Sequence, residues 1–166
     1  MRLLSLVLSF SLTAATVNAQ AALSPQTQKQ AETEVLAVVN RLWEAMRTND
    51  SVMARTVFDT GAQMITITPT GTVSRSSPSG FIRNIGRSTT PWIERMVNPE
   101  VRIDQNLASV WTWYDFARNG IVSHCGYDSI ELARTANGWK IIYLADTKTF
   151  ITPQSPAGIC KPPAPR

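Results

Sequence analysis

The chain has 166 residues, which is enough for one domain of ordinary size. Sixteen Lys and Arg residues against twelve Asp and Glu residues give a formal net charge of +4, and 43% of the residues are hydrophobic while only 17% are charged. This composition excludes a wholly disordered chain. The basic residues are scattered singly between Arg41 and Lys161, so we expect no nucleic-acid partner.

Residues 1–19 have the pattern of a secretory signal peptide. Arg2 precedes an apolar stretch over residues 3–15, and Val17-Asn18-Ala19 offers the small residues that a signal peptidase cuts after. An uncleaved membrane anchor is the alternative, but the apolar stretch is short for a span and polar residues follow it. The pattern predicts a periplasmic or extracellular protein with no membrane contact after cleavage.

The chain contains two cysteines, Cys125 and Cys160. In an oxidising compartment they can form a disulfide, which would tie down the C-terminal tail. Two unrelated thiols are the alternative, because the spacing does not show that the two Cα atoms come within bonding reach.

The first half of the mature chain predicts three helices and a short hairpin. Ser24-Pro25 is a helix start, and apolar residues then recur at helical spacing until Thr48-Asn49. Asp50 can cap a second, short helix. Residues 64–68 are rich in β-branched side chains and precede a turn at 69–71. Ser77-Pro78 starts a third helix to about residue 86, and residues 87–91 are expected to form a loop.

The second half predicts a four-stranded antiparallel meander. Residues 100–104 alternate in polarity, with a bulge or break at Asn98-Pro99. Further strands are expected over residues 107–116, 121–134 and 139–150, joined by tight turns at Asn119-Gly120 and Asn137-Gly138. The order predicts an α+β domain over residues 20–151, with helices on a curved antiparallel sheet, and a Pro-rich tail over residues 152–166.

Several short runs carry a family resemblance. They are Leu42-Trp43, the run 111–116 (WTWYDF), the run 123–128 (SHCGYD), and Gly138-Trp139-Lys140-Ile141 leading to Asp146-Thr147. With the element order, they resemble the nuclear-transport-factor-2-like (NTF2-like) superfamily, which includes polyketide cyclases, ketosteroid isomerase and scytalone dehydratase. The last two runs are most similar to a secreted bacterial branch labelled SnoaL-like or lumazine-binding-like. The resemblance covers about residues 32–150 and implies a cystatin-like cone. It implies no single activity, because the superfamily includes enzymes, ligand binders and dimerisation modules.

The two tight turns also predict which side chains share a sheet face. Counting outward from Asn119-Gly120 pairs Asp115 with His124 and Trp111 with Asp128, and counting from Asn137-Gly138 pairs Leu132 with Tyr143. The face expected to lie under the helices carries Trp111, Trp113, Asp115, His124, Asp128, Ile130, Leu132, Trp139, Ile141 and Tyr143. The opposite face carries Tyr114, Cys125, Tyr127, Ser129, Leu144 and Asp146. A bulge at Gly126 would exchange part of this assignment.

Three acid–base groups are candidate catalytic residues. His124, the only histidine, can act as a general base oriented by Asp115, and Asp128 can act as a pocket acid or base. The alternatives are a structural histidine with one hydrogen bond in the core, and acids that cap strand ends or bond turn amides. Asp146 is a further candidate of the same kind.

Five aromatic residues are candidate ligand-binding residues for a small, flat apolar or heterocyclic molecule: Trp43, Trp111, Trp113, Trp139 and Tyr143. The alternative is that they fill the cone as a packed core. No metal site is expected, because His124 and Asp128 lie about 13 Å apart along their strand. No Gly-rich phosphate loop is present, and no cofactor is expected.

These observations support three hypotheses. The first is a secreted small-molecule-binding domain with an aromatic pocket. The second is a cofactor-free isomerase, dehydratase or hydrolase that uses His124 with Asp115 or Asp128. The third is an interaction module that forms a homodimer through the outer sheet face, with Tyr114, Tyr127 and Leu144.

Overall fold

The protein is described by a computed structural model over residues 25–153 and 159–164. The signal-peptide prediction for residues 1–19 lies outside the described residues, as does part of the predicted Pro-rich tail. In chain order the elements are α1 (Pro25–Thr48), α2 (Ser51–Val57), β1 (Phe58–Ile67), β2 (Val73–Ser76), α3 (Pro78–Arg87), β3 (Trp92–Asp104), β4 (Leu107–Arg118), β5 (Ile121–Thr135), β6 (Gly138–Thr147) and β7 (Thr149–Phe150).

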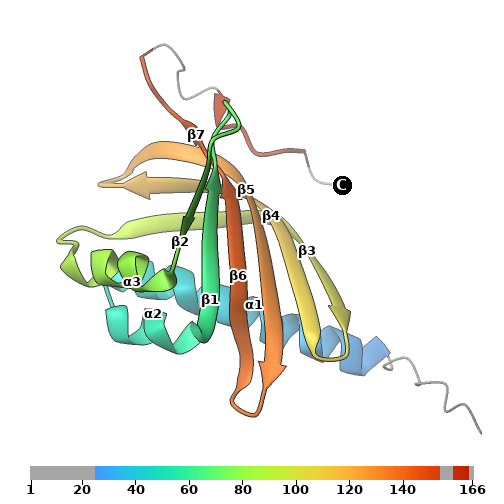
Figure 1. Ribbon diagram of the computed structural model, residues 1–166. Helices are drawn as coiled ribbons and strands as arrows, with labels where there is room; N and C mark the ends of the chain where they lie inside the picture. Colours follow the sequence, from blue (N-terminus) through green and yellow to red (C-terminus); the bar gives the residue numbers. More distant parts are fainter. Residues whose placement is uncertain (1–24, 154–158, 165–166) are drawn as a thin grey trace, which may run out of the picture.

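One strongly curved sheet wraps around the three helices, as Figure 1 shows. Its strand order is β2-β1-β6-β5-β4-β3, and β7 pairs with β5. The long helix α1 lies across the concave face, while α2 and α3 lie together at one end. The core fills the space between α1 and the sheet. The predicted α+β architecture of helices on a curved sheet is confirmed. None of the described helices is long and apolar enough to cross a membrane.

The helices follow their predicted start and stop signals. Helix α1 begins at Pro25 and ends at Thr48, and the apolar stripe that includes Val35, Val39 and Leu42 is fully buried. The Asp50 carboxylate accepts a hydrogen bond of 2.8 Å from the Met53 amide and caps α2. Helix α3 opens at a proline, although the preceding serine makes no side-chain capping bond.

The sheet is mixed, because β1 runs parallel to β6 while every other pair is antiparallel. Strand β3 begins at Trp92, earlier than the sequence indicates. Its register against β4 shifts between Val97 and Glu100, and Asn98 has a φ of 53°. The predicted bulge at Asn98-Pro99 is therefore confirmed.

A second bulge, which lies in β5, reverses the prediction of which β4 side chains face the helices. Arg118 pairs with Ile121 as predicted, but the register then shifts, so that Ala117 pairs with Val122 and Phe116 with His124. Ser123 is the extra residue, three positions before the glycine where a bulge was considered. Asp115 consequently pairs with Cys125, and the predicted pairing of Asp115 with His124 is wrong.

A third irregularity reverses the prediction of which side chains face the helices in part of β6. The last turn lies one residue earlier than predicted, with Thr135 paired to Gly138, and the register shifts again between Glu131 and Leu132. Tyr143 therefore pairs with Glu131 rather than Leu132, and it lies on the outer face. The residues that follow it, Leu144 and Asp146, face the helices.

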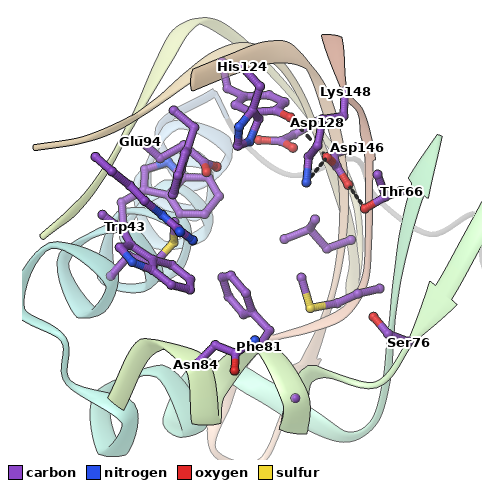
Figure 2. A pocket seen from close by; sticks show the side chains of 18 of the residues that line it. Trp43, Thr66, Ser76, Phe81, Asn84, Glu94, His124, Asp128, Asp146 and Lys148 are labelled. Carbon is purple, nitrogen blue, oxygen red and sulfur yellow. Dashed lines mark hydrogen bonds and ion pairs between the residues drawn. The ribbon is translucent and has the colours of Figure 1, made fainter. Parts of the chain in front are cut away.

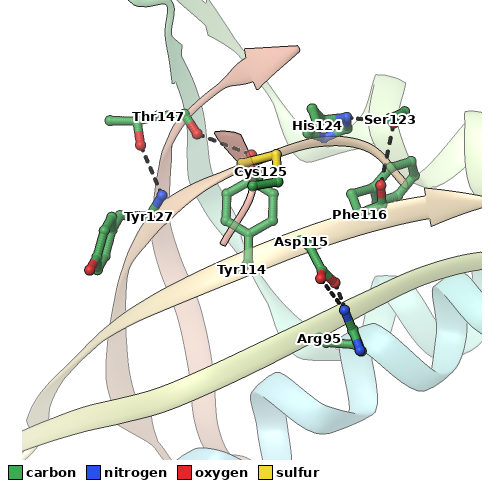
Figure 3. The surroundings of a disulfide bond; sticks show 10 residues. Arg95, Tyr114, Asp115, Phe116, Ser123, His124, Cys125, Tyr127 and Thr147 are labelled. Carbon is green, nitrogen blue, oxygen red and sulfur yellow. Dashed lines mark hydrogen bonds and ion pairs between the residues drawn. A yellow bond between two sulfur atoms is a disulfide. The ribbon is translucent and has the colours of Figure 1, made fainter. Parts of the chain in front are cut away.

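Cys125 and Cys160 form a disulfide, with a Cα–Cα distance of 5.6 Å (Figure 3). The bond joins the outer face of β5 to the described tail segment 159–164. Pro163 and Ala164 of this segment border a small hollow of about 20 Å³ together with Trp113 and Tyr127. The tail is thus fixed against the convex side of the sheet.

Candidate functional site

A cavity of about 430 Å³ lies between the concave face of the sheet and the helices α1 and α3 (Figure 2). This volume is within the range of small-molecule sites. One part of its wall is apolar and the opposite part is polar. Exposed side chains border it where it opens, among them Ser76, Asn84 and Arg118. The apolar wall is formed by Trp43, Met46, Met64, Phe81, Trp92, Phe116 and Leu144, and the polar wall by Thr66, Glu94, Tyr114, His124, Asp128, Asp146 and Lys148.

Asp146 collects the hydrogen-bond donors of the polar wall. Thr66 donates to Oδ1 at 2.6 Å, the Tyr114 hydroxyl donates to Oδ2 at 3.1 Å, and Lys148 Nζ lies 3.3 Å from Oδ2. Both oxygens of Asp146 are therefore bonded. Gly126, the cross-strand partner of Tyr114, has no side chain, and the carbonyl oxygen of Thr147 occupies the place where a Cβ would lie.

Asp128 lies directly opposite Asp146 across the β5–β6 pair and is 2% exposed. Its Oδ2 atom is buried and has no hydrogen-bond partner among the described residues. Burial raises the pKa of the Asp128 carboxyl, the charges of Glu94 and Asp146 raise it further, and Lys148 opposes them. The carboxyl is therefore held in its protonated form more firmly than an ordinary aspartate.

Glu94 projects from β3 into the same space. Burial, followed by the charge of Asp146, raises the pKa of Glu94 to about 8, although Lys148 works in the opposite direction. The polar wall thus contains two carboxyls with raised pKa values, of which Glu94 binds a proton at neutral pH, beside one carboxylate that accepts three donors.

His124 is a neutral imidazole in this environment. Burial is the main cause that lowers the pKa of His124 to about 4, and the positive charges of Lys148 and Arg118 add to it, against Asp146. The ring stacks on Phe116 at 4.7 Å, and Nδ1 lies 2.8 Å from the Ser123 hydroxyl. The bulge at Ser123 therefore both turns the ring toward the cavity and supplies its hydrogen-bond partner.

Comparison with known proteins gives relatives in structure but not in sequence. No family model and no curated protein matches the sequence. In all, 259 chains of solved structures match the fold. An NTF2-like protein of unknown function from Shewanella baltica has 14% identity and a TM-score of 0.58, with coverage of 74% of this chain and 97% of that one. An NTF2-like superfamily protein from Salmonella enterica has 17% identity and a TM-score of 0.57, with coverage of 75% and 94%.

A protein from Streptomyces avermitilis, provisionally described as a dehydratase of the NTF2-like family, has 15% identity and a TM-score of 0.60, with coverage of 75% of this chain and all of that one. The chain has the NTF2-like fold. At these identities the likeness establishes the fold alone. What the cavity of this NTF2-like domain binds or does has to be argued from its own residues.

The NTF2-like cone places the predicted acid–base residues on two different faces. His124 and Asp128 both line the cavity. Asp115 does not, because it lies on the outer face, where its carboxylate accepts two hydrogen bonds from the Arg95 guanidinium, one of them 2.8 Å long (Figure 3). Asp115 therefore cannot orient His124, and that part of the prediction is wrong.

Of the five predicted ligand-binding aromatics, Trp43 alone lines the cavity. Trp139 is 5% exposed and belongs to the core cluster. The other three lie on the outer face: Trp111, Trp113 and Tyr143. Trp111 is 45% exposed and stacks on Tyr127 at 5.1 Å. The other aromatic side chains in the cavity wall belong to residues that were not predicted to contact a ligand: Phe81, Trp92, Tyr114 and Phe116.

The predicted dimer surface is also altered by the bulges. Tyr114 and Leu144 line the cavity rather than the outer face, and only Tyr127 of the three lies outside. Glu94 and Lys148 join the site without any local sequence signal. Glu94 lies on a part of β3 that sequence periodicity does not reveal, and Lys148 follows the end of β6.

Proposed function

We propose that this protein binds a small organic molecule with an apolar body and a polar head in the cavity between α1, α3 and the sheet. The observation that carries the proposal is Asp128, a buried carboxyl in the wall of a cavity, with one oxygen that has no partner among the residues that the structure describes. Leaving a buried polar group without a partner costs about 1–3 kcal/mol. A ligand that donates a hydrogen bond to Asp128 removes this cost.

The apolar wall supports a flat body for the ligand. Trp43 from α1, Phe81 from α3 and Trp92 from β3 supply aromatic surface from three separate elements. Aromatic rings offer large apolar contact area and favour stacked or edge-on partners. A molecule of one or two rings fits both the wall and the volume.

A screen of one- and two-ring amphipathic compounds by thermal shift, followed by titration calorimetry, tests the proposal. We expect a compound that binds the wild-type protein to lose at least tenfold in affinity in Leu144→Trp, which fills the cavity. Trp111→Ala, which removes an aromatic ring from the outer face, is the matched control and should leave the affinity unchanged. The absence of any binder, or equal losses in the two variants, contradicts the proposal.

Acid–base catalysis without a cofactor is the second candidate function. One observation favours it: the cavity holds a neutral imidazole, His124, together with Asp128, a carboxyl whose raised pKa favours the protonated form, and a base and an acid need these two forms. An isomerase, dehydratase or hydrolase would use this pair. If a compound is turned over, His124→Ala and Asp128→Asn should keep the fold and abolish turnover, while Asp115→Asn should not.

Export from the cytoplasm is part of the proposal. It is supported by the signal pattern over residues 1–19 and by the Cys125–Cys160 disulfide, a bond that persists in oxidising compartments. N-terminal sequencing of the protein from its natural host should give a mature chain that begins at Gln20. An uncut N-terminus contradicts this part of the proposal.

A further inference from the structure

We propose that the ligand of this cavity is a small organic cation, an amine or amidinium carried on a flat apolar body. The inference rests on the proposed binding function and names the chemical class of its ligand. It follows from the hydrogen-bond donors, the charges and the aromatic faces that meet at the polar wall (Figure 2).

Three donor groups of the polar wall are turned toward Asp146. Thr66, Tyr114 and Lys148 all bond to Asp146, and Tyr114 also donates to the Thr147 carbonyl oxygen at 3.1 Å. Within the described part of the chain, no hydrogen bond or ion pair reaches the carboxyl of Glu94 or of Asp128. Once ionised, these two carboxyls are acceptors only, so a ligand that brings N–H donors and a positive charge would satisfy both.

The charges favour a cation over a neutral donor. Three carboxyl groups, on Glu94, Asp128 and Asp146, share the polar wall with one ammonium group, on Lys148. His124 is neutral there. Arg118 does not offset the carboxyls, because it stands at the opening, with its guanidinium 4.3 Å from the Trp92 ring centre. The carboxylate of Asp146 would repel an anionic ligand. A cation would instead balance the negative charge of a second carboxylate, that of Glu94 or Asp128.

The aromatic rings around the polar wall point to the same class. Trp43, Trp92, Tyr114 and Phe116 present rings to the cavity, and the faces of aromatic rings attract organic cations. Arg118 shows this attraction inside the chain itself, since its guanidinium lies over both Trp92 and Phe116. A ligand ammonium between the rings and the carboxyls would gain from both.

Cation binding is coupled to proton release. The raised pKa values of Glu94 and Asp128 favour their protonated forms, and an ammonium beside them favours their ionised forms. The charged and titratable groups that face them are Asp146 and Lys148 from the β6 side, His124 from β5, and Tyr114 and Arg118 from β4. The affinity for an amine should therefore rise with pH up to the pKa of the amine, with protons passing to the buffer.

Three probes of nearly equal size test the inference by titration calorimetry: 2-(1-naphthyl)ethylamine, 2-(1-naphthyl)ethanol and the carboxylate 1-naphthaleneacetate. We expect the amine to bind at least tenfold more tightly than the alcohol and the acetate at pH 7.5. Titrations in two buffers of different ionisation enthalpy should show net proton release with the amine only. In Glu94→Gln combined with Asp128→Asn, the amine should lose its advantage over the alcohol. Asp115→Asn, on the outer face, is the control and should keep it.

The outcomes separate this inference from the proposed function. Tighter binding of the alcohol or the acetate, or proton uptake with the amine, overturns the inference and leaves small-molecule binding intact. Equal affinities for the three probes, all abolished by Leu144→Trp, also overturn the inference and leave small-molecule binding intact. Binding of none of the three at millimolar concentration contradicts both. Circular dichroism of the double variant checks that any loss does not come from unfolding.

Discussion

The free energy of unfolding should fall as the pH rises from 6.5 to 8. The pKa of Glu94 is raised from its ordinary 4.5 to about 8, so the folded protein holds a proton in this window that the unfolded chain has released, and the raised pKa of Asp128 acts in the same direction. Each proton held in this way lowers the stability by about 1.4 kcal/mol per pH unit. Because Glu94 is half-buried and titrates near the upper end of the window, we expect a total loss of about 1–2 kcal/mol.

His124 has the opposite effect on the free energy of unfolding, and most of it falls below this pH range. The pKa of His124 is lowered to about 4 in the folded protein, so the unfolded chain binds more protons between pH 4 and 6.5. Stability from this residue therefore rises with pH, mostly below 6.5, and levels off by about pH 7.5. Above that pH only the raised carboxyls contribute a slope, and below it His124 offsets a small part of theirs.

Urea denaturation at pH 6.5, 7.0, 7.5 and 8.0, with the disulfide intact, measures the effect. We expect the slope to shrink in Glu94→Gln and in Asp128→Asn and to vanish in the double variant. Glu44→Gln is the control, because that exposed carboxyl has a lowered pKa and releases no proton in this window. A wild-type stability that is flat or rises over the range refutes the raised pKa of Glu94 in the polar wall.

Three further predictions concern single residues. In an NMR titration, the His124 ring should titrate near pH 4, and a pKa above 6 contradicts its burial. Removing the disulfide with Cys160→Ser should lower the free energy of unfolding by about 3–4 kcal/mol, as measured by urea denaturation, because the bond closes a long loop; a change below about 1 kcal/mol contradicts this. Gly126→Ala should destabilise the domain by about 3 kcal/mol, because its Cβ would overlap the Thr147 carbonyl oxygen. Gly61→Ala, where the Cβ meets open space, is the matched thermal-unfolding control, and equal effects of the two would refute the overlap.

Much of the fold follows from local signals. The proline at position 25 and the stripe from Val35 to Met46 specify α1, and Asp50 specifies α2 through its own side chain. The strained backbone of Asn98 marks a real bulge. Asn119 and Gly120 both have positive φ angles, 51° and 75°, as their turn requires. Each of these features depends on residues within a few positions of one another.

The candidate site depends on longer-range interactions. The bulge at Ser123 has no local signal, because it is stabilised by contacts across strands: His124 stacks on Phe116 and pairs with Phe150 of β7. This single extra residue moves Tyr114 and Phe116 inward and Trp111, Trp113 and Asp115 outward. The parallel β1–β6 pair, which brings Thr66 to Asp146, joins segments about eighty residues apart. Alternation along one strand cannot predict either feature.

A crystal structure of the protein soaked with 2-(1-naphthyl)ethylamine at pH 8 tests the central claim most directly. We expect the naphthalene rings to lie between Trp43 and Phe81, with the ammonium within hydrogen-bond distance of Asp128 or Glu94. A cavity closed by repacked side chains, or a compound bound only on the outer face beside Trp111, would contradict it.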